Sequence, residues 1–454
     1  MASAPDRREA QAGSRMSAAD RKVLAGTMVG TTIEWYDFFI FAQAAGLVFA
    51  SLYFGPLEGE SPGLAQLVAW ATIGISFFFR PLGAVIAGRL GDRIGRKAML
   101  VFTLVLMGSA TALIGLLPTY AQIGVWAPIL LMLLRILQGF SAGGEWGGAA
   151  LMAVEHAPVG KRGFWGAYPQ IGVPVGMILA TLVLFLLRSS MSPEAFMAWG
   201  WRIPFLLSVV LIVVGYFIRS AVAESPVFRR MIERKRDTAT PLRSLLRTNK
   251  REVILAAVIF IGNNAAGYLV IAFLSSYAQK SLGMPAAPVL LATLLASFGW
   301  LIFTLYGGIL SDRIGRVRTF QLGYALIFVW MIPMFMLIDT RSIWAYGIAI
   351  FVLTIGLGLS YGPMSAMYAE MFPANVRYSG IGIGYALGAI LGGAFAPLIA
   401  QALLGSTGWS GSIGLYIMGL CVISFIGVSL VKEPSGAPLE ADEKSADAVP
   451  AARH

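Results

Sequence analysis

Cysteine and histidine are almost absent from this sequence of 454 residues, which contains one cysteine, Cys421, and two histidines, His156 and His454. A single cysteine excludes a disulfide framework within the chain, and two distant histidines argue against a histidine-based metal site. We therefore expect no disulfide, no metal and no cofactor.

Charged residues are also scarce. They make up 13% of the chain, against roughly 25% in an ordinary soluble domain. Hydrophobic residues make up 57%, and the mean hydropathy is +0.75. This composition indicates an integral membrane protein. Because each crossing takes about 20 apolar residues, the length accommodates about twelve spans. The spans must be helices, since no strand-length alternation is visible, so we predict an all-α membrane protein.

The net charge of +11 would suit a nucleic-acid partner if it were spread over one surface. Instead, the basic residues fall on one side of an up-and-down helix count, in Arg21–Lys22, Arg89–Lys97, Lys161–Arg162, 229–251 and Arg313–Arg318. The other side carries little net charge, with Glu58, Glu60, Lys280, Asp339 and Arg341. The positive-inside rule then makes the basic side cytoplasmic, with both termini there, and predicts no nucleic-acid partner. Met1–Lys22 lacks the apolar core of a signal peptide and is interpreted as a cytoplasmic tail.

Two segments of the sequence occur twice. A loop of pattern G-x-L-x-D-R-x-G-R holds Asp92 and returns with Asp312, an offset of 312 − 92 = 220 residues. The segments at Glu155 and Glu370 repeat at 370 − 155 = 215. This spacing is too long for solenoid units of about 20 to 50 residues, so each half must be a bundle. We predict a tail over 1–22, a six-helix bundle over 23–221, a cytoplasmic linker over 222–252, a second bundle over 253–431 and a tail over 432–454.

Ionisable side chains within the apolar runs concentrate in the first half. Because each costs at least about 2.5 kcal/mol in mid-membrane, each is a candidate functional residue. Arg80 lies 12 residues before Asp92, which places it roughly 18 Å deeper than the loop. Arginine suits bidentate capture of a carboxylate. We predict a substrate site with Arg80, Arg135, Gln138 and Tyr36, and proton carriers among Glu34, Asp37 and Glu145. The alternative is that these charges only pair with one another.

The second half lacks such charges and offers amide and aromatic side chains. Asn263 and Asn264 hold roughly the place in the seventh helix that Glu34 holds in the first, and we predict that they donate hydrogen bonds to substrate. Trp300, Tyr361 and Tyr368 are predicted to shape the wall of the site. Packing alone is the open alternative for each aromatic residue.

The repeated loops predict a latch on the cytoplasmic side. A carboxylate at a helix N-terminus is favoured by the helix dipole, and we expect Asp92 at the start of the eleventh helix, near Tyr378. Arg93 and Arg96 can then pair with acids such as Glu155 and Glu370. The complete set of predicted gating residues is Asp92, Arg93, Arg96, Glu155, Arg162, Asp312, Arg313, Glu370 and Arg377. The alternative is that these loops only set orientation.

The repeated loop resembles the loop between the second and third helices of major facilitator superfamily transporters. Four further segments, beginning at Gly30, Arg80, Arg135 and Glu224, together with Ala369–Pro373, resemble the metabolite:proton symporter family within it, over about Arg21–Glu433. That resemblance implies proton-driven uptake across a bacterial inner membrane of oxoglutarate, citrate or tricarballylate, shikimate, aromatic acids, or zwitterions such as proline and betaine. The chain lacks the long C-terminal coiled coil of the osmosensory betaine and proline carriers.

These observations predict a transporter, not an enzyme, that imports a small organic anion with protons by alternating access. Uptake of zwitterionic osmolytes is the first alternative, and the two arginines oppose it. Efflux of drugs or metabolites is suggested only by Gly172–Gly176, which lacks the fuller glycine pattern of drug antiporters. A non-transporting sensor would need an appended signalling domain, for which the tails are too short. We expect a monomer in the lipid bilayer.

Overall fold

The computed structural model describes the backbone of residues 18–59, 63–94, 96–143, 145–158, 160–221, 247–373 and 376–435. Side chains are described over the same ranges except for residues 18–20, 87–94, 96–98, 100, 219 and 221. Within these ranges the regular structure is entirely helical, as the apolar runs predict.

The N-terminal half consists of the helices from α2 to α12, with short helices and turns at their ends. They are α2 (Ala18–Ala44), η1 (Ala45–Phe49), α3 (Ala50–Tyr53), α4 (Gly55–Glu58), α5 (Leu64–Ile94), α6 (Arg96–Leu116), α7 (Tyr120–Ile123), α8 (Trp126–Ala142), α9 (Trp146–Glu155), α10 (Arg162–Ser190), α11 (Pro193–Ala198), η2 (Gly200–Arg202) and α12 (Ile203–Ala221). The segment η1 is a turn of π-helix and η2 a turn of 3₁₀-helix.

The C-terminal half repeats this pattern. Its elements are α15 (Lys250–Tyr268), η3 (Leu269–Phe273), α16 (Leu274–Ser276), η4 (Tyr277–Ser281), α17 (Ala286–Ile314), α18 (Arg316–Asp339), α19 (Ile343–Tyr361), α20 (Met364–Met371), α21 (Arg377–Gly392), α22 (Ala396–Thr407) and α23 (Gly411–Ser429). Both η3 and η4 are π-helical, so helix α15 and helix α2 each continue into π-helical turns.

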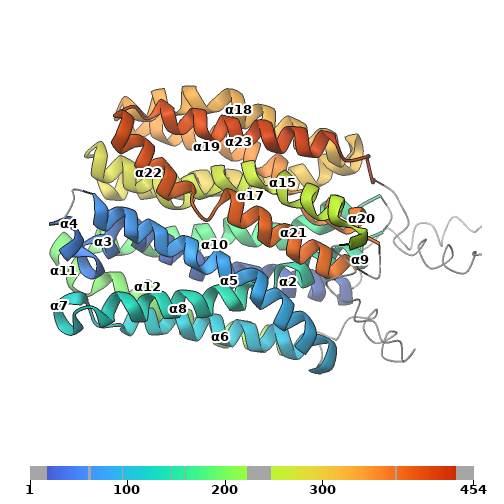
Figure 1. Cartoon of the computed structure of the whole chain (residues 1–454), viewed down its shortest axis with the longest axis horizontal. Coiled ribbons are helices and arrows are strands. Elements are labelled where there is room, and N and C mark those ends of the chain that lie inside the picture. The colour runs from blue at the N-terminus through green and yellow to red at the C-terminus, as the bar shows by residue number, and fades with distance from the viewer. Residues whose placement is uncertain are drawn as a thin grey trace, which may run out of the picture.

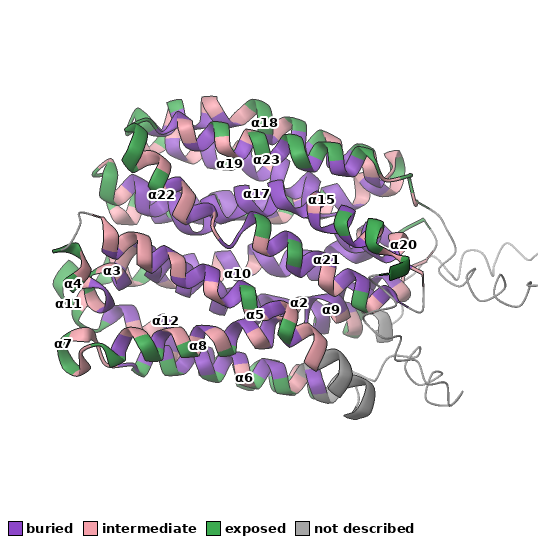
Figure 2. Ribbon diagram, viewed as in Figure 1, coloured by how far each residue is buried: buried purple, intermediate pink, exposed green. Residues whose placement is uncertain are grey.

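Eleven helical segments within the described residues are long and apolar enough to cross a membrane, and α6 contributes a shorter apolar stretch, Val101–Leu116. Together they give the twelve spans that the length predicts. Large apolar side chains cover the outside of the bundle, as with Val329 at 70% and Met336 at 67% exposure, and Figure 2 shows such exposed positions along the outer helices. Apolar surface of this extent fits contact with lipid.

The two halves lie side by side, the N-terminal half blue to green and the C-terminal half yellow to red in Figure 1. Helix α10 of the first half packs along α17 of the second, and α5 packs against α21. At one end of the molecule, Gly163 of α10 meets Gly308 of α17 so closely that a Cβ on Gly308 would lie 2.6 Å from the Gly163 carbonyl oxygen. We call this end, where the Ile94–Arg96 and Ile314–Arg316 connections lie, the basic end.

Three spans are interrupted within the described residues. The fourth is split into α8 and α9, the tenth into α19 and α20, and the eleventh into α21 and α22. In the fourth span the first residue after α8 is Gly143, where a Cβ would lie 1.9 Å from the Arg80 carbonyl oxygen of α5. Interruptions inside a membrane are tolerated where the backbone is buried in protein, and all three lie in spans that contact the opposite half.

Candidate functional site

Arg135 is held entirely by its own half of the protein. It is 0% exposed, and its Nη1 donates to Gln138 Oε1 at 2.6 Å, its Nη2 to Ser76 Oγ at 2.8 Å and its Nε to the Thr72 carbonyl at 3.4 Å. Its guanidinium also lies 3.8 Å from the ring centre of Phe41. Each nitrogen of the guanidinium thus has a neutral partner on α5 or α8, which fixes the orientation of Arg135.

Arg80 is held differently. It is 3% exposed, and its Nε and Nη2 have no hydrogen-bond partner among the described residues. Its guanidinium carbon lies 4.5 Å from the ring centres of Phe38 and Phe77 and 5.7 Å from that of Trp35. Because a buried donor without a partner costs about 1 to 3 kcal/mol, and more when charged, Arg80 is the side chain of this region best suited to bind an anion.

Aromatic residues of the C-terminal half complete the surroundings of Arg80. The ring of Tyr268 lies 5.3 Å from that of Phe77 in an edge-on contact, and Tyr268 and Tyr385 lie within electrostatic range of Arg80. The Trp300 ring lies over Gly267, beside Tyr268. We define the central cluster as Trp35, Arg80, Tyr268, Trp300, Tyr361 and Tyr385. It spans both halves, so a ligand bound there would contact both.

A stack of four aromatic rings joins the halves next to Arg80. Trp146 lies parallel to Tyr385 with ring centres 3.8 Å apart, and Tyr385 in turn stacks on Phe260 at 4.6 Å. Phe260 is followed by Tyr361 at 6.2 Å. Trp146 is oriented by Gln170, which accepts its Nε1 proton at 2.9 Å and donates to the Tyr361 carbonyl at 3.3 Å.

The acids predicted as proton carriers lie in different places. Glu34 is within electrostatic range of Tyr268, Tyr361 and Tyr385 of the C-terminal half. Asp37 instead accepts from Ser208 of α12 at 2.5 Å. Positions three apart on a helix differ by about 60° around its axis, which is enough to direct the two carboxyls to different neighbours. Asp37 thus lies inside the N-terminal half.

The other predicted proton carrier, Glu145, is buried at the break between α8 and α9. Glu145 is seven residues after Gln138, a spacing that would put both on one face of a continuous helix. Because α8 ends at Ala142 and α9 begins at Trp146, the helix is not continuous between them. Gln138 links Arg135 to α6, because its Nε2 donates to Thr111 Oγ1 at 2.7 Å. The Tyr36 hydroxyl donates to the Pro204 carbonyl at 2.8 Å, and therefore faces α12 and not the central cluster.

The predicted residues of the C-terminal half divide into two groups. Trp300 and Tyr361 belong to the central cluster. Asn263 donates its Nδ2 protons to Ser360 Oγ at 2.7 Å and to the Leu357 carbonyl at 3.0 Å, and Asn264 donates to the Ala389 carbonyl at 3.1 Å. Tyr368 donates its hydroxyl proton to the Ala256 carbonyl. The Asn263, Asn264 and Tyr368 donors are therefore used to join α15 to α19, α20 and α21.

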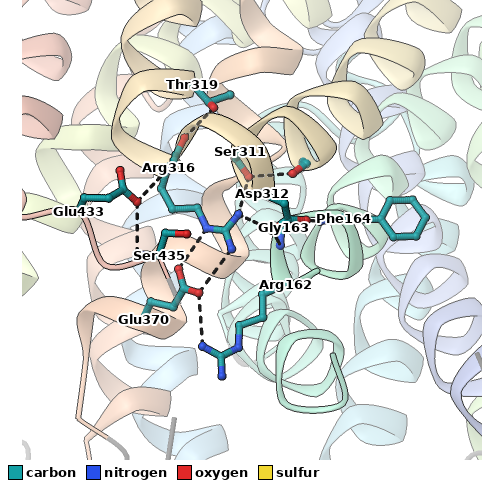
Figure 3. A network of polar contacts seen from close by, with 12 residues as sticks. Arg162, Gly163, Phe164, Ser311, Asp312, Arg316, Thr319, Glu370, Glu433 and Ser435 are labelled. Atoms are coloured by element: carbon teal, nitrogen blue, oxygen red, sulfur yellow. Dashed lines mark hydrogen bonds and ion pairs between the residues drawn. The ribbon is translucent and has the colours of Figure 1, made fainter. Parts of the chain in front are cut away.

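A second polar site bridges the halves at the basic end (Figure 3). Asp312 of α17 accepts from the backbone N–H groups of Gly163 and Phe164 at 2.8 Å each, and so caps the N-terminus of α10. Arg316 binds Asp312 at 2.7 Å and Glu370 at 3.1 Å, and Arg162 of α10 lies 3.5 Å from Glu370. Asp312 has the geometry that the sequence predicts for Asp92, its counterpart.

The remaining gating predictions have varied outcomes. The side chains of Asp92, Arg93 and Arg96 lie outside the described residues. Arg313 is exposed, Glu155 is partly buried at the end of α9, and Arg377 donates to the Phe372 carbonyl at 3.0 Å. Sequence reasoning missed Arg316 as a gating residue. Its position, 316 − 96 = 220 residues after Arg96, is the signal that would have identified it.

Sequence reasoning also missed Trp146 and Tyr385. Trp146 directly follows Glu145, which was singled out, whereas Tyr385 lies in a glycine-rich apolar segment that indicates only helix packing. Opposite the basic end, two further contacts join the halves: Ser276 Oγ donates to the Gly46 carbonyl at 3.1 Å, and Lys280 Nζ donates to Gln66 Oε1 at 2.9 Å. The two halves are therefore joined by contacts at both ends.

The described residues include no group of three or more histidine, cysteine or acidic side chains able to hold a metal ion. Within the described part of the chain, the site is built from the available guanidinium of Arg80, buried carboxyls, and tyrosine and tryptophan donors.

Comparison with known proteins identifies the class. The family model described as Major Facilitator Superfamily matches residues 27–397. The chain therefore belongs to the major facilitator superfamily, and it is a multi-pass membrane transporter and not an enzyme.

Individual relatives differ in what they carry. The chain is 38% identical to the inner membrane metabolite transport protein YhjE of Escherichia coli, over 91% of this chain and 94% of the relative. It is 37% identical to the shikimate transporter of Escherichia coli over the same shares. It is also 31% identical to the proline/betaine transporter of Salmonella typhimurium, over 92% of this chain and 85% of that protein.

Solved structures agree on the fold. The proton:xylose symporter XylE superposes with a TM-score of 0.75, covering 94% of this chain and 99% of XylE, at 16% sequence identity. Identity this low supports the twelve-helix architecture alone.

Proposed function

We propose that this protein is a proton-coupled symporter that imports a small organic anion, with Arg80 binding the carboxylate. The observation that carries the proposal is the buried Arg80 guanidinium, whose Nε and Nη2 have no partner among the described residues, between the two halves. A planar guanidinium binds a carboxylate through two parallel hydrogen bonds. Similarity to the shikimate transporter and to metabolite transporters supports an organic acid as the substrate.

Arg135 has a supporting role in this proposal. Its nitrogens are bonded to α5 and α8, so it contributes positive charge near the site while the bound carboxylate is held by Arg80. The hydrogen bonds from Arg135 to Gln138 and from Gln138 to Thr111 extend toward α6, where Gly108 lies beside Asp37. Thr111 is also a hydrogen-bond partner of Asp37, so this network joins Asp37 to Arg135.

We assign proton carriage to Asp37, Glu34 or Glu145, in that order. Asp37 is buried at 1% exposure and accepts from Ser208. Its hydrogen bonds are made to Ser208 of α12 and to Thr111 and not to Arg80, and so it can change its protonation state without occupying the anion's binding groups. Buried carboxyls in low dielectric are suited to exchange protons.

Transport by alternating access needs contacts that break in turn. We propose that Asp312, Arg162 and Glu370 close the basic end, and that Lys280 and Ser276 close the opposite end. Paired repeats of this kind move largely as rigid bodies around a fixed central site. By the positive-inside rule the basic end faces the cytoplasm, in a bacterial inner membrane, with both termini on that side.

The alternative is a symporter of zwitterionic osmolytes, which the 31% identity to the proline/betaine transporter supports. Such a substrate also carries a carboxylate for Arg80. It differs in needing a site for a cationic group.

The test is uptake by the full chain in proteoliposomes with an imposed inward proton gradient, using radiolabelled organic acids and betaine. We expect concentrative uptake of an organic acid. Asp37→Asn should abolish accumulation while leaving exchange of internal for external substrate measurable. Failure of any organic acid to enter, with uptake of betaine, would replace the proposal by the osmolyte alternative. Loss of exchange together with accumulation would move Asp37 into the substrate site.

A further inference from the structure

The central cluster has a distinctive inventory of hydrogen-bonding groups. Apart from Arg80, the groups in it that lack a hydrogen-bond partner within the described residues are neutral, namely Trp35 Nε1, Tyr268 OH and Trp300 Nε1. The hydroxyls of Tyr361 and Tyr385 lie close enough to interact with each other. Each is buried. Since leaving such a group unsatisfied costs about 1 to 3 kcal/mol, a ligand that fits the cluster has oxygen atoms for these groups in addition to its carboxylate.

Among the described residues of this region, Arg80 is the cation whose donors remain available to a ligand. Arg135 is fully buried, with each nitrogen bonded to its own half. Arg162 and Arg316 bind Glu370 at the basic end, and Lys280 binds Gln66 at the opposite end. A second ligand carboxylate would therefore lack a cation with available donors to bind it, and burial of a carboxylate without hydrogen bonds is unfavourable.

The aromatic side chains that the structure describes around Arg80 do not form a cage for a second cation. In the stack of Trp146, Tyr385, Phe260 and Tyr361, neighbouring rings cover each other's faces. The faces of Phe38 and Phe77 are already in contact with the Arg80 guanidinium. Cations bind aromatic faces, whereas ring edges are electropositive and suit oxygen atoms. The arrangement thus disfavours a quaternary ammonium group.

We infer that the substrate is a ring-shaped monocarboxylate that carries hydroxyl groups. Its carboxylate binds Arg80, its hydroxyl oxygens meet Tyr268, Tyr385 and the neighbouring tryptophan N–H groups, and its rigid carbon skeleton packs between the aromatic edges. This inference rests on the proposed function, and it narrows that function by excluding dicarboxylates, tricarboxylates and betaine as preferred substrates. A site built to bond hydroxyl groups rejects analogues that lack them.

The test compares ligands that differ in their hydroxyl, carboxylate and ammonium groups. Binding to the purified full chain is measured by calorimetry for benzoate, 4-hydroxybenzoate, shikimate, isophthalate, citrate and glycine betaine. We expect shikimate and 4-hydroxybenzoate to bind more tightly than benzoate. Isophthalate, which adds a second carboxylate to the same ring, and citrate should bind at least tenfold more weakly than the hydroxylated monocarboxylates. Betaine should not bind.

Two tyrosine variants test which side chains bind the hydroxyl groups of the ligand. Tyr268→Phe and Tyr385→Phe should each weaken binding of the hydroxylated ligand by about fivefold, the equivalent of one net hydrogen bond of about 1 kcal/mol. Binding of benzoate should be unchanged. Tyr346→Phe is the matched control, because its buried hydroxyl bonds Thr293 at 3.2 Å, away from the central cluster.

The outcomes separate this inference from the proposed function. If isophthalate or citrate binds as tightly as the hydroxylated monocarboxylates or more tightly, the substrate is not a ring-shaped monocarboxylate. If that ligand is also taken up with protons in an Arg80-dependent way, organic-anion symport remains the function. Tyrosine variants that weaken benzoate as much as 4-hydroxybenzoate would overturn hydroxyl recognition. Binding of betaine alone would overturn both.

Discussion

Arg80 and Arg135 are both buried arginines, but we assign them different roles, substrate binding and support of the site. Their hydrogen bonds are the basis of this distinction. Arg135 donates from every nitrogen to partners on α5 and α8. Arg80 keeps two nitrogens available, against aromatic rings. Sequence position identifies both as buried cations, but it carries no information about which of them is already bonded. The structure supplies that difference.

Arg135→Lys should lower the stability of the folded protein. A lysine ammonium is a point charge and cannot reach Ser76, Gln138 and the Thr72 carbonyl in the planar arrangement of a guanidinium. Loss of one such charged hydrogen bond costs about 1.5 to 3 kcal/mol. We expect a lower melting temperature in detergent, measured by tryptophan fluorescence. The control is Arg188→Lys, since Arg188 lies at the far end of α10 against Phe196. An unchanged melting temperature for Arg135→Lys would contradict the supporting role.

The acids and tyrosines show what a single sequence conceals at this scale. Glu34 and Asp37 were both predicted as proton carriers, yet one lies near the tyrosines of the opposite half and the other bonds Ser208. Asn263, Asn264, Tyr36 and Tyr368 were predicted as substrate ligands, and their donors instead bond the backbone or side chains of neighbouring helices. Only the packing of distant helices decides these contacts.

At the scale of elements, close contact between α5 and α8 sets the position of Arg80. Gly83, Gly139 and Gly143 lie at this contact, and Cβ atoms there would come within 2.0 Å of backbone carbonyl oxygens on the other helix. Small residues allow membrane helices to approach at the backbone. The break at Gly143 could not be predicted from the sequence, because local sequence signals do not reveal where a neighbouring helix packs against the backbone.

Gly143→Ala should therefore disrupt the site. The new methyl would lie 1.9 Å from the Arg80 carbonyl oxygen, so α5 and α8 must separate. We expect reduced folded yield by size-exclusion chromatography, and in the folded fraction weaker ligand binding. Gly419→Ala in α23 is the control, since a Cβ there meets nothing within 4 Å. Equal yield and affinity for the two variants would show that the contact is not needed.

A second prediction at this scale concerns the basic end. Asp312→Asn removes the ion pair with Arg316 and weakens the cap on α10, so the halves should separate there more often. Ser365→Cys, in a Cys421→Ser background, reports this opening through its rate of modification by a water-soluble maleimide. Ser365 is buried beside Gly166 of α10. We expect faster modification with Asp312→Asn.

The control for this experiment is Arg318→Gln, which removes charge from an exposed position near the same connection. Its modification rate should match that of the background. If Asp312→Asn also leaves the rate unchanged, the basic-end network does not act as a latch.

At the scale of the whole molecule, the sequence predicted most of the architecture. Repeats at Asp92 and Asp312 predict two related bundles, and the apolar runs predict the spans. The family match confirms the superfamily, and the XylE structure has the same fold. The particular hydrogen bonds between the halves could not be predicted, because they depend on how the two six-helix bundles are oriented relative to each other. In this structure both ends are bridged, by Asp312 with α10 and by Lys280 with Gln66.

Charge balance leads to a prediction about energetics. A monoanion that enters with one proton moves no net charge across the membrane. We therefore expect uptake to respond to a pH gradient and not to a membrane potential set by potassium and valinomycin. Both driving forces can be imposed separately on the same proteoliposomes. Accumulation driven by potential alone would contradict one proton per monoanion.

The central claim is that Arg80 binds the carboxylate of the substrate, and ligand-induced stabilisation tests it most directly. A ligand that binds the folded state raises the free energy of unfolding by mass action, by about 2.7 kcal/mol at 100 times its Kd. The melting temperature rises as a result. We predict that an organic acid raises the melting temperature of the wild type and of Arg188→Ala, and that Arg80→Ala abolishes the shift. The same shift in Arg80→Ala would contradict the account.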